Sequence, residues 1–437
     1  PKKMAFEFLF EKSGITCPSD SLKVLIYLPY LKLFITVHHF LLNLIKQLKS
    51  IEVGILLWEG LSMKNYFIIT ILTIILSTNA YSDHKIEEQN FTGVSYSAPG
   101  SDNYQKLEIE LVDNKLSQYV QKQLDNRDKT GLVNYLLFEN GKIVINKKNY
   151  NDQIKKNKNV LRSNSMGKSL ISYVVGHAVC KGFIDNVNVK LNDWIVLNDT
   201  LYADNTLLQV LNMTSGDQDY IGEKKFKGDG YFNGDKNKQI NRRTVAESML
   251  WFKGTKKKEE NSPYNYSAMS THVAINYAIH KVGKDYEKLL KEIFTDHVGV
   301  KDTVHFIKVS WSPKDVVKGS QRYTFFATSE DYLRIAKTIM NDYKSDSCIG
   351  DYLRMIYDNR VDKKKKEYVS NKGVAQYSRQ YGGQFHFPKI GKNIVFGMDG
   401  YAGQQILIDI TNGRIVIIHT IDQHYDWNKI GLSVIKN

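Results

Sequence analysis

The chain has 437 residues, and its 60 lysines and arginines outnumber its 46 aspartates and glutamates, which gives a formal net charge of +14 at pH 7. This length allows two or three domains, or one enzyme with an insertion, and it is ample for a large hydrophobic core. The two densest basic runs, residues 256–258 and 363–366, are each followed by glutamate in polar surroundings. We therefore interpret them as solvated loops and expect no nucleic-acid partner.

Residues 1–62 are rich in aromatic, aliphatic and lysine residues. The most apolar stretch, 22–45, is interrupted by Lys23, Pro29, Lys32 and the pair His38-His39, so no window reaches a clean span of about 20 apolar residues. The segment that begins at Met63 has the form of a secretory signal peptide. It has a short basic start, then an apolar run over 66–76, and then the small residues 77–80. We predict a signal peptide within 63–82, translation from Met63, and export to the periplasm or the medium, with no stable membrane span in the mature protein. A membrane-anchoring extension is the alternative for residues 1–62.

Hydrophobic spacing and turn signals predict these elements beyond residue 83: a helix over 107–125, strands over 133–138 and 142–146, a helix from 165 to about 182, helices over 206–213, 244–252, 271–282, 286–294 and 329–340, strands over 394–396, 405–410 and 414–419, and a closing helix over 427–435. Asn140-Gly141 and Asn412-Gly413 predict two hairpin turns. Strands at both ends with helices between them predict an α/β (α+β) fold with one antiparallel sheet built from both chain ends. Within 83–437, the α/β part would cover about 105–175 and 320–437, and a mostly helical part about 176–319.

The cysteines Cys17, Cys180 and Cys348 have neither metal-ligand spacing nor the density of a disulfide framework. A single bridge between Cys180 and Cys348 stays open. Because Cys180 falls on an apolar helical stretch, a buried small hydrophobic side chain is the favoured interpretation. The sequence has no zinc-protease motif and its histidines are scattered, so we predict neither a metal site nor a cofactor.

The segment Ser165-Met166-Gly167-Lys168 places a serine and a lysine three residues apart at the start of a predicted helix. Residues i and i+3 share one helix face, so the ammonium group of Lys168 can reach the hydroxyl of Ser165. Unpaired N–H groups and a partial positive charge in the first helical turn favour an oxyanion. Ser165 is therefore a candidate nucleophile, although a capping serine followed by a solvated lysine has the same pattern.

Two later segments offer partners for this serine. Tyr266, in Tyr264-Asn265-Tyr266-Ser267-Ala268, precedes a predicted helix. A phenol near an ammonium group ionises more readily, so Tyr266 could act as general base toward Ser165 and then as acid toward the leaving group. The glycine-rich segment 397–405 could bring a strand edge and a backbone N–H close to a substrate. Taken singly, the two segments equally fit aromatic packing and a bend between strands.

In this order, Ser165-Met166-Gly167-Lys168, Tyr266-Ser267-Ala268 and Met398-Asp399-Gly400 resemble the three motifs of the serine β-lactamase and penicillin-binding-protein superfamily. The chain is most similar to the class C β-lactamase-like branch, which includes 6-aminohexanoate-dimer hydrolases, esterases and D-amino-acid peptidases. Accessory segments at 180–184, 208–216, 326–333 and 381–383 are similar too. The resemblance therefore extends from about residue 105 to the C-terminal residue.

The resemblance implies a role for each motif residue. Ser165 would be the acylated nucleophile, Lys168 its electrostatic activator and Tyr266 the proton shuttle. The backbone N–H groups of Ser165 and Tyr401 would form the oxyanion hole. Residues expected to contact the substrate are Asp399, Gly400 and Tyr220.

The sequence departs from the family pattern at two positions. Ala268 stands where asparagine is common, and Met398 stands where β-lactamases carry lysine or histidine. Losing that cation removes the usual anchor for a substrate carboxylate, so a small amide or ester is favoured over a β-lactam. Asp399 could instead suit an amine-bearing substrate.

These features predict an exported serine hydrolase that acts on a small-molecule amide or ester, and its oligomeric state stays open. A penicillin-binding-type D-amino-acid peptidase or a β-lactamase is one alternative, and a catalytically inactive cell-envelope binding module is another. Nucleotide binding is disfavoured, because Gly167-Lys168-Ser169 ends like a P-loop but Arg162 occupies a position that requires glycine.

Overall fold

A computed structural model describes residues 95–221, 244–308, 321–364, 373–422 and 425–436. The chain divides into two compact units, Pro1–Asp83 and His84–Asn437, and all described residues belong to the second. The predicted upstream extension and signal peptide lie outside the described residues. None of the described helices combines the length and the hydropathy that crossing a bilayer requires.

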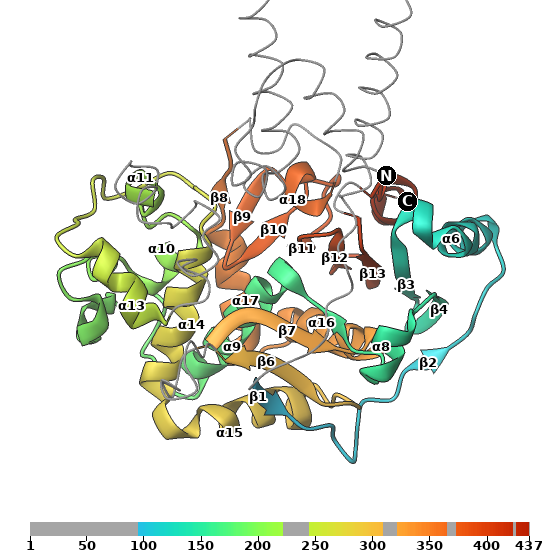
Figure 1. Cartoon of the computed structure of the whole chain (residues 1–437), viewed down its shortest axis with the longest axis horizontal. Coiled ribbons are helices and arrows are strands. Elements are labelled where there is room, and N and C mark those ends of the chain that lie inside the picture. Colours follow the sequence, from blue (N-terminus) through green and yellow to red (C-terminus); the bar gives the residue numbers. More distant parts are fainter. Residues whose placement is uncertain (1–94, 222–243, 309–320, 365–372, 423–424, 437) are drawn as a thin grey trace, which may run out of the picture. The chain divides into compact units, whose positions relative to one another are not determined.

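Both chain ends contribute to one large sheet, as the sequence predicted (Figure 1). In the described residues its strand order is β2-β4-β3-β13-β12-β11-β10-β9-β8, and every neighbouring pair is antiparallel except β2 and β4. The strands are β2 (Glu108–Ile109), β3 (Leu132–Glu139), β4 (Lys142–Lys148), β8 (Val361–Asp362), β9 (Gln380–Gly382), β10 (Phe385–Phe387), β11 (Val395–Gly400), β12 (Gln404–Asp409) and β13 (Arg414–Thr420).

The two predicted hairpins are confirmed. β3 and β4 are joined by Asn140 and Gly141, whose φ angles of 52° and 82° are those of a two-residue turn that matches the twist of the strands. β12 and β13 form the second hairpin, with Gly413 at a φ of 67°. The two hairpins pair with each other through β3 and β13, and this pairing joins the two ends of the chain.

Both faces of the large sheet are buried, which explains the apolar runs at 135–138 in β3 and at 415–418 in β13. Successive side chains of a strand point to opposite faces. Leu136 and Ile417 lie in the main core, whereas Leu137 and Val416 lie in a second apolar cluster that α6 (Lys115–Asp125), α18 (Val374–Tyr377) and α19 (Ser433–Lys436) complete.

A second sheet was not predicted. It has the order β1-β6-β7-β5 and consists of β1 (Ser95–Ala98), β5 (Leu161–Arg162), β6 (Val304–Lys308) and β7 (Gln321–Ala327). These strands come from distant parts of the sequence, and β5 has two residues, so no local pattern indicated them. β5 leads directly into the Ser165 segment and pairs with β7. The second sheet therefore supports the entry to the predicted nucleophile helix.

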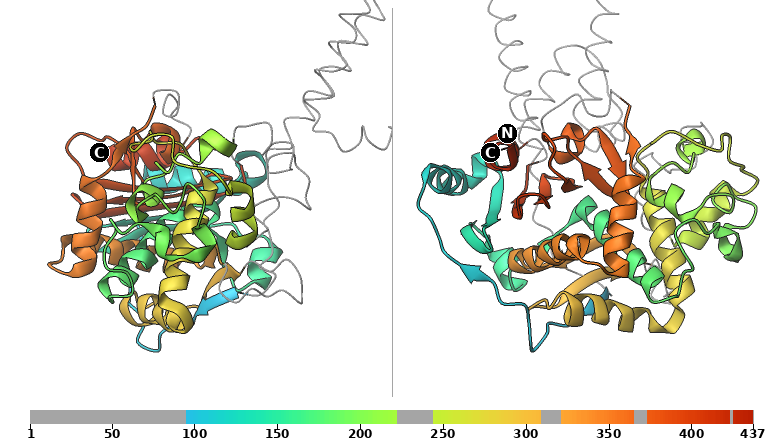
Figure 2. Two further views of the ribbon diagram at one scale, coloured as in Figure 1. Left: turned by 90° about the vertical axis from the view of Figure 1, so that its left-hand side faces the viewer. Right: turned by 180° about the vertical axis from the view of Figure 1, so that it is seen from behind.

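Most of the helices lie in the sequence between the strands that the two chain ends contribute to the large sheet. Besides those named above, they are α7 (Arg127–Thr130), α8 (Asp152–Lys156), α9 (Gly167–Cys180), α10 (Leu207–Leu211), α11 (Gln218–Ile221), α13 (Val245–Met249), α14 (Ala268–Val282), α15 (Tyr286–Lys291), α16 (Ser329–Lys344) and α17 (Cys348–Asp358). α10, α11, α13 and α14 gather on one side of the sheets (Figures 1 and 2). The predicted mixed α/β fold is thus confirmed.

The first predicted helix is wrong in its N-terminal half. Residues 108–109 form β2, and α6 begins only at Lys115, where the Asn114 side chain accepts a hydrogen bond from the N–H of Ser117. An asparagine cap of this kind fixes a helix start more strongly than the apolar spacing before it. Leu111, which the helical spacing included, is 62% exposed.

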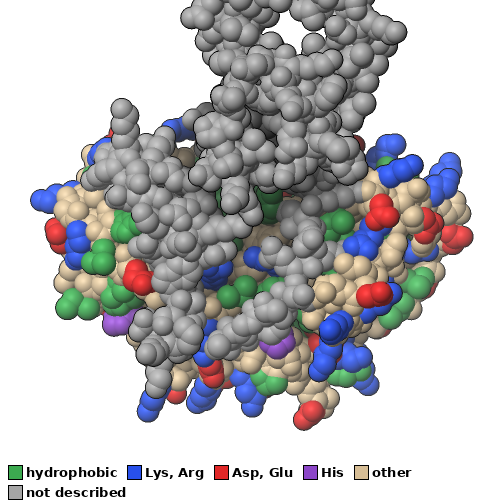
Figure 3. Space-filling view, viewed as in Figure 1, with side chains coloured by type: hydrophobic (Ala, Val, Ile, Leu, Met, Phe, Trp, Pro, Cys, Tyr) green, Lys and Arg blue, Asp and Glu red, His purple; other side chains and the backbone are tan. Residues whose placement is uncertain are grey.

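Charged side chains are mixed on the face that Figure 3 shows. Lysines and arginines lie among aspartates, glutamates and uncharged residues there, and they do not gather into one continuous patch. The expectation that nucleic acid is not a partner stays a prediction.

The structure corrects the interpretation of Cys180 as a simple hydrophobic side chain. Cys180 at the end of α9 forms a disulfide with Cys348 at the start of α17, with Cα atoms 5.7 Å apart. Sequence alone left this pairing open, because 168 positions separate the two cysteines. Cys17 lies outside the described residues.

We expect the disulfide to contribute substantially to stability, because a cross-link across so long a loop restricts the unfolded chain. Replacing both Cys180 and Cys348 with serine should lower the free energy of unfolding by about 2–5 kcal/mol. Denaturant titration of the wild-type and variant proteins measures this loss, and a reductant should destabilise only the wild type. Equal unfolding midpoints with and without reductant would contradict the bridge.

Candidate active site

Ser165 lies in a single 3₁₀ turn, η2 (Asn164–Met166), immediately before α9. Asn164 adopts a left-handed conformation with φ 47°, which asparagine tolerates better than most residues. Its side-chain amide donates a 2.7 Å hydrogen bond to the carbonyl of Tyr401. The turn that presents Ser165 is therefore fixed from the side of β11.

Two glycines allow the backbone to approach this turn closely. A Cβ atom at Gly167 would lie 1.8 Å from the backbone oxygen of Tyr323 in β7, and one at Gly400 would lie 2.5 Å from the backbone oxygen of Ser163. Any side chain at either position would push a strand away from Ser165. Gly400, predicted to contact the substrate, thus also determines how β11 packs against the nucleophile turn.

Lys168 is the central charge of the site, and the prediction that it reaches Ser165 is confirmed. Its Nζ lies 3.2 Å from Oγ of Ser165, and its side chain is 2% exposed. The ammonium group also lies 3.3 Å from the ring centroid of Tyr323 and 5.1 Å from that of Tyr266. A buried cation next to two aromatic faces is stabilised where water cannot reach it.

The charges at this site reinforce one another. Burial lowers the pKa of Lys168, but the phenol groups of Tyr266 and Tyr323 outweigh burial, so the pKa is raised and the lysine keeps its charge at neutral pH. The same ammonium group lowers the pKa of Tyr323 against the opposing effect of burial. Lys168 is therefore suited to stabilise negative charge nearby.

Three contacts to residues 213–218, which lead into and begin α11, hold Tyr266 beside this lysine. The N–H of Asn265 donates to the carbonyl of Met213 at 2.9 Å, and the Gln218 amide donates to the carbonyl of Tyr266 at 3.0 Å. The hydroxyl of Ser267 donates to the buried carboxylate of Asp217. Tyr266 itself stays 42% exposed.

The remaining predicted residues lie at different places. Tyr401 is beside Asn164 and is 54% exposed, whereas Met398 is buried. Oδ2 of Asp399 accepts a 3.1 Å hydrogen bond from the N–H of Ala375, at the start of α18. The hydroxyl of Tyr220 donates to the carbonyl of Lys256, and its helix α11 neighbours Tyr266 through Gln218. The roles of these residues in catalysis or binding stay predictions.

Sequence reasoning missed three residues that build the site. Tyr323 has no motif, and it reaches Lys168 only because β7 passes beside η2. Asp217 accepts a hydrogen bond from Ser267 and holds it in place. Burial raises the pKa of the Asp217 carboxyl group, although the hydroxyl groups that donate to it act in the opposite direction. Gln384 connects two helices, because its carbonyl accepts from Ser169 of α9 and its side-chain oxygen accepts from Thr271 of α14. The polarity of the buried Asp217 and Gln384 was the only available signal, and the partly buried Tyr323 gave none.

Asp399 gives the fold a pH dependence that can be measured. Burial raises its pKa to about 6, so the folded state holds a proton that the unfolded chain would release near pH 4. Stability from this group is complete below about pH 4 and is lost as the pH rises through about 6. Asp399→Asn cannot ionise and should be more stable than the wild type above pH 6. We expect a difference in the free energy of unfolding of about 1–2 kcal/mol, because the Asp399 side chain keeps some contact with solvent, which reduces the effect of burial.

Thermal unfolding of both proteins between pH 4 and pH 8 tests this prediction. The two proteins should have similar stability at pH 4 and diverge as the pH rises. A constant difference across the range would show that the carboxyl group titrates normally.

No family model matches the chain, and no curated protein sequence matches it significantly. Solved structures do match its fold. A proposed 6-aminohexanoate-dimer hydrolase from Bacillus anthracis is 15% identical, with a TM-score of 0.55 over 78% of this chain and 89% of that one. A proposed β-lactamase from Bacteroides dorei is 16% identical, with a TM-score of 0.51 over 73% and 98%.

A third similar structure is the D-amino acid amidase from Ochrobactrum anthropi in complex with D-phenylalanine. It is 16% identical, with a TM-score of 0.51 over 74% of this chain and 100% of that one. The chain therefore has the β-lactamase-like fold that these proteins share, and the fold expected from the three motifs is confirmed.

Proposed function

We propose that the chain is a serine hydrolase that cleaves a small amide or ester through an acyl-enzyme on Ser165. The observation that carries this proposal is the 3.2 Å contact between Nζ of Lys168 and Oγ of Ser165, with the lysine enclosed by two tyrosine rings. A serine hydroxyl becomes a useful nucleophile when a neighbouring cation stabilises the developing alkoxide and a base takes the proton. Lys168 is the proposed cation, and Tyr266 is the proposed base.

The proposed reaction has two half-reactions. Oγ of Ser165 attacks the substrate carbonyl carbon while Tyr266 accepts its proton as general base, and backbone N–H groups of Ser165 and Tyr401 bind the oxyanion. Tyr266 then gives this proton to the leaving amine or alcohol as the bond to the carbonyl carbon breaks. A water molecule attacks the resulting ester by the same route, and Ser165 is released.

The comparisons support a hydrolase of small amides. Similar structures include proteins named as a 6-aminohexanoate-dimer hydrolase and a D-amino acid amidase, and the latter was solved with D-phenylalanine. The side chain of Met398 is apolar and buried, so the third motif strand brings no cation at that position to a substrate carboxylate. Amides or esters without a free carboxylate are therefore the proposed substrates.

A panel of substrates tests the proposal. It contains D- and L-phenylalanine amide, p-nitrophenyl esters, a linear 6-aminohexanoate dimer, an acyl-D-Ala-D-Ala peptide and nitrocefin. Faster turnover of an amide or ester supports the proposal, whereas preference for the peptide or nitrocefin favours the peptidase or β-lactamase alternative. No turnover, together with no labelling by a fluorophosphonate probe, would favour the inactive binding module.

The two tyrosines next to Lys168 should have unequal effects on catalysis. Tyr266→Phe removes the proposed proton shuttle and should lower kcat by about 10²–10⁴-fold. Tyr323→Phe loses the hydroxyl that hydrogen-bonds Lys168 and Ser165 but keeps the aromatic face that lies 3.3 Å from the lysine, and it should lower kcat by about 10-fold or less. Steady-state kinetics on the best ester compare them, and the reverse order would make Tyr323 the base.

We also propose that the mature protein is exported. The disulfide between Cys180 and Cys348 supports this, because such bonds persist mainly in oxidising compartments. N-terminal sequencing of the native protein tests the predicted signal peptide: a start near Tyr81 supports export, and a start near Pro1 contradicts it.

A further inference from the structure

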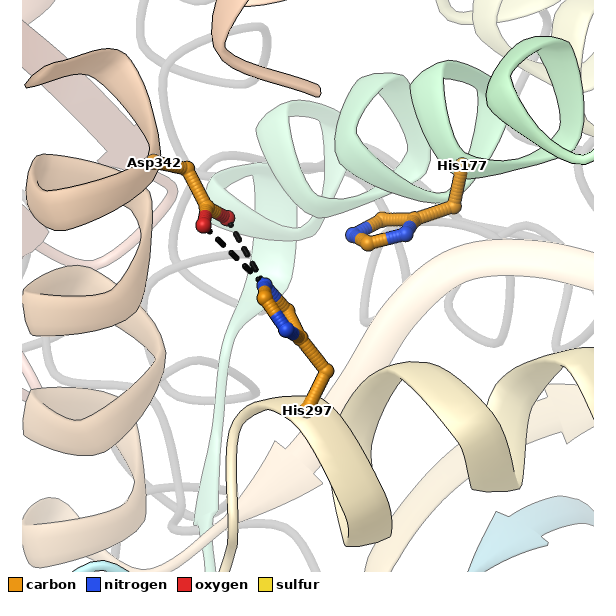
Figure 4. Close-up of side chains that lie close together, drawn as sticks. All are labelled: His177, His297 and Asp342. Atoms are coloured by element: carbon orange, nitrogen blue, oxygen red, sulfur yellow. Dashed lines mark hydrogen bonds and ion pairs between the residues drawn. The ribbon is translucent and has the colours of Figure 1, made fainter. Parts of the chain in front are cut away.

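Two histidines and an aspartate from three helical segments meet away from the proposed hydrolytic site. His177 is on α9, His297 ends the π-helical turn η8 (Glu292–His297), and Asp342 is on α16. One ligand atom from each lies within 4.8 Å of the others. Figure 4 shows both imidazole rings directed toward the Asp342 carboxylate. His177 is nine residues beyond Lys168, or about 13 Å along the helix, so the cluster is separate from Ser165.

The contacts within the cluster leave one nitrogen unused. Nε2 of His297 lies 3.0 and 3.1 Å from the two carboxylate oxygens of Asp342. Nε2 of His177 is buried and has no hydrogen-bond partner in the described part of the chain, although His177 is 8% exposed. A buried ring nitrogen without a partner is costly unless another group satisfies it. Its ring points at the two groups that could share a ligand with it.

We propose that His177, His297 and Asp342 bind one divalent transition-metal ion of the Zn²⁺ type. Two imidazoles and a carboxylate are ligands that Zn²⁺ accepts in a tetrahedral site. Such ligands lie about 3.4 Å apart when each is about 2.1 Å from the ion, a spacing that His297 and Asp342 already approach. His297 is on the exposed side of the cluster, where a water molecule can occupy the fourth position.

The surroundings prepare the three side chains for a metal ion. His177 is buried, and its ring faces the other two side chains of the cluster. The hydroxyl of Tyr173 donates to Oδ2 of Asp342 and orients the carboxylate, as second-shell donors do in metal sites.

The ion would stabilise the helices around the proposed active site. It would connect α9, η8 and α16, and the disulfide from Cys180 to Cys348 joins α9 to α17 close by. A bound metal ion raises stability by mass action, because the unfolded chain does not preserve the site. The site would therefore act on folding and not on bond cleavage.

Zinc titration of the full chain tests the proposal. The protein is prepared without a histidine tag and treated with EDTA, and calorimetry then measures the stoichiometry and affinity for Zn²⁺. We expect one ion per chain, a higher Tm with Zn²⁺, and a Co²⁺ derivative with the strong visible absorption of four-coordinate cobalt. His297→Ala and Asp342→Asn should each weaken binding by about 100-fold or more, and Tyr173→Phe by about 10-fold.

His280→Ala is the matched control. His280 is an exposed histidine on α14 that stacks on Trp194, and its loss should leave zinc affinity unchanged. His297 is exposed, so its alanine variant should fold, and circular dichroism checks this. Equal zinc affinity in His297→Ala and His280→Ala, or no one-to-one complex at micromolar zinc, would overturn the proposal.

Discussion

Ser165→Ala should abolish hydrolysis of every substrate that the wild-type protein turns over, with a loss in kcat of about 10⁴–10⁶-fold. The variant loses the oxygen that forms the acyl-enzyme. A water molecule in its place would have to attack the substrate directly, without the covalent intermediate that divides the reaction into two easier steps. The fold should be largely unaffected, because the hydroxyl of Ser165 hydrogen-bonds Lys168 and Tyr323, and these two side chains keep their contact with each other in the variant. Steady-state kinetics and fluorophosphonate labelling measure the effect.

Mass spectrometry of the labelled protein identifies the modified residue directly. Label should appear on the peptide that contains Ser165 and disappear in Ser165→Ala. Ser172→Ala is the control on the same helix, since the Ser172 hydroxyl exchanges a 2.9 Å hydrogen bond with Tyr352 and is fully buried. Labelling that persists in Ser165→Ala would move the nucleophile elsewhere and contradict the proposed function.

Lys168→Met should separate activity from stability. Methionine fills the space of the lysine stem but brings no charge, so nothing stabilises the Ser165 alkoxide, and we expect kcat to fall by about 10³-fold. The free energy of unfolding should stay within about 1 kcal/mol of the wild type, because the lost cation–π contacts are offset by no longer burying an ammonium group. Kinetics and denaturant titration measure the two effects.

Lys281→Met is the matched control for the loss of one positive charge. Nζ of Lys281 makes a 2.8 Å ion pair with Asp193 at the surface, and its removal should leave kcat unchanged. Turnover by Lys168→Met at the wild-type rate would remove the lysine from the mechanism. A large loss of stability with unchanged kcat would assign Lys168 a purely structural role.

Sequence alone determined the features that depend on near neighbours in the chain. The spacing of Ser165 and Lys168 fixed their contact, because one helical turn brings positions i and i+3 together. Asn140-Gly141 fixed a hairpin, because that pair accepts the positive φ angles of a two-residue turn. The order of three motifs then predicted a fold that solved structures share.

Only the tertiary structure decided what depends on contacts between distant segments. Tyr323 lies against Lys168 because β7 pairs with β5 just before the nucleophile turn. The Cys180–Cys348 bridge requires α9 and α17 to pack side by side across 168 residues of chain. Neither Tyr323 nor the cysteine pair carries a local sequence pattern, because the partners in each contact are close in space and not along the chain. The same holds for the cluster of His177, His297 and Asp342, in which folding alone places a buried imidazole and a carboxylate within reach of one ion.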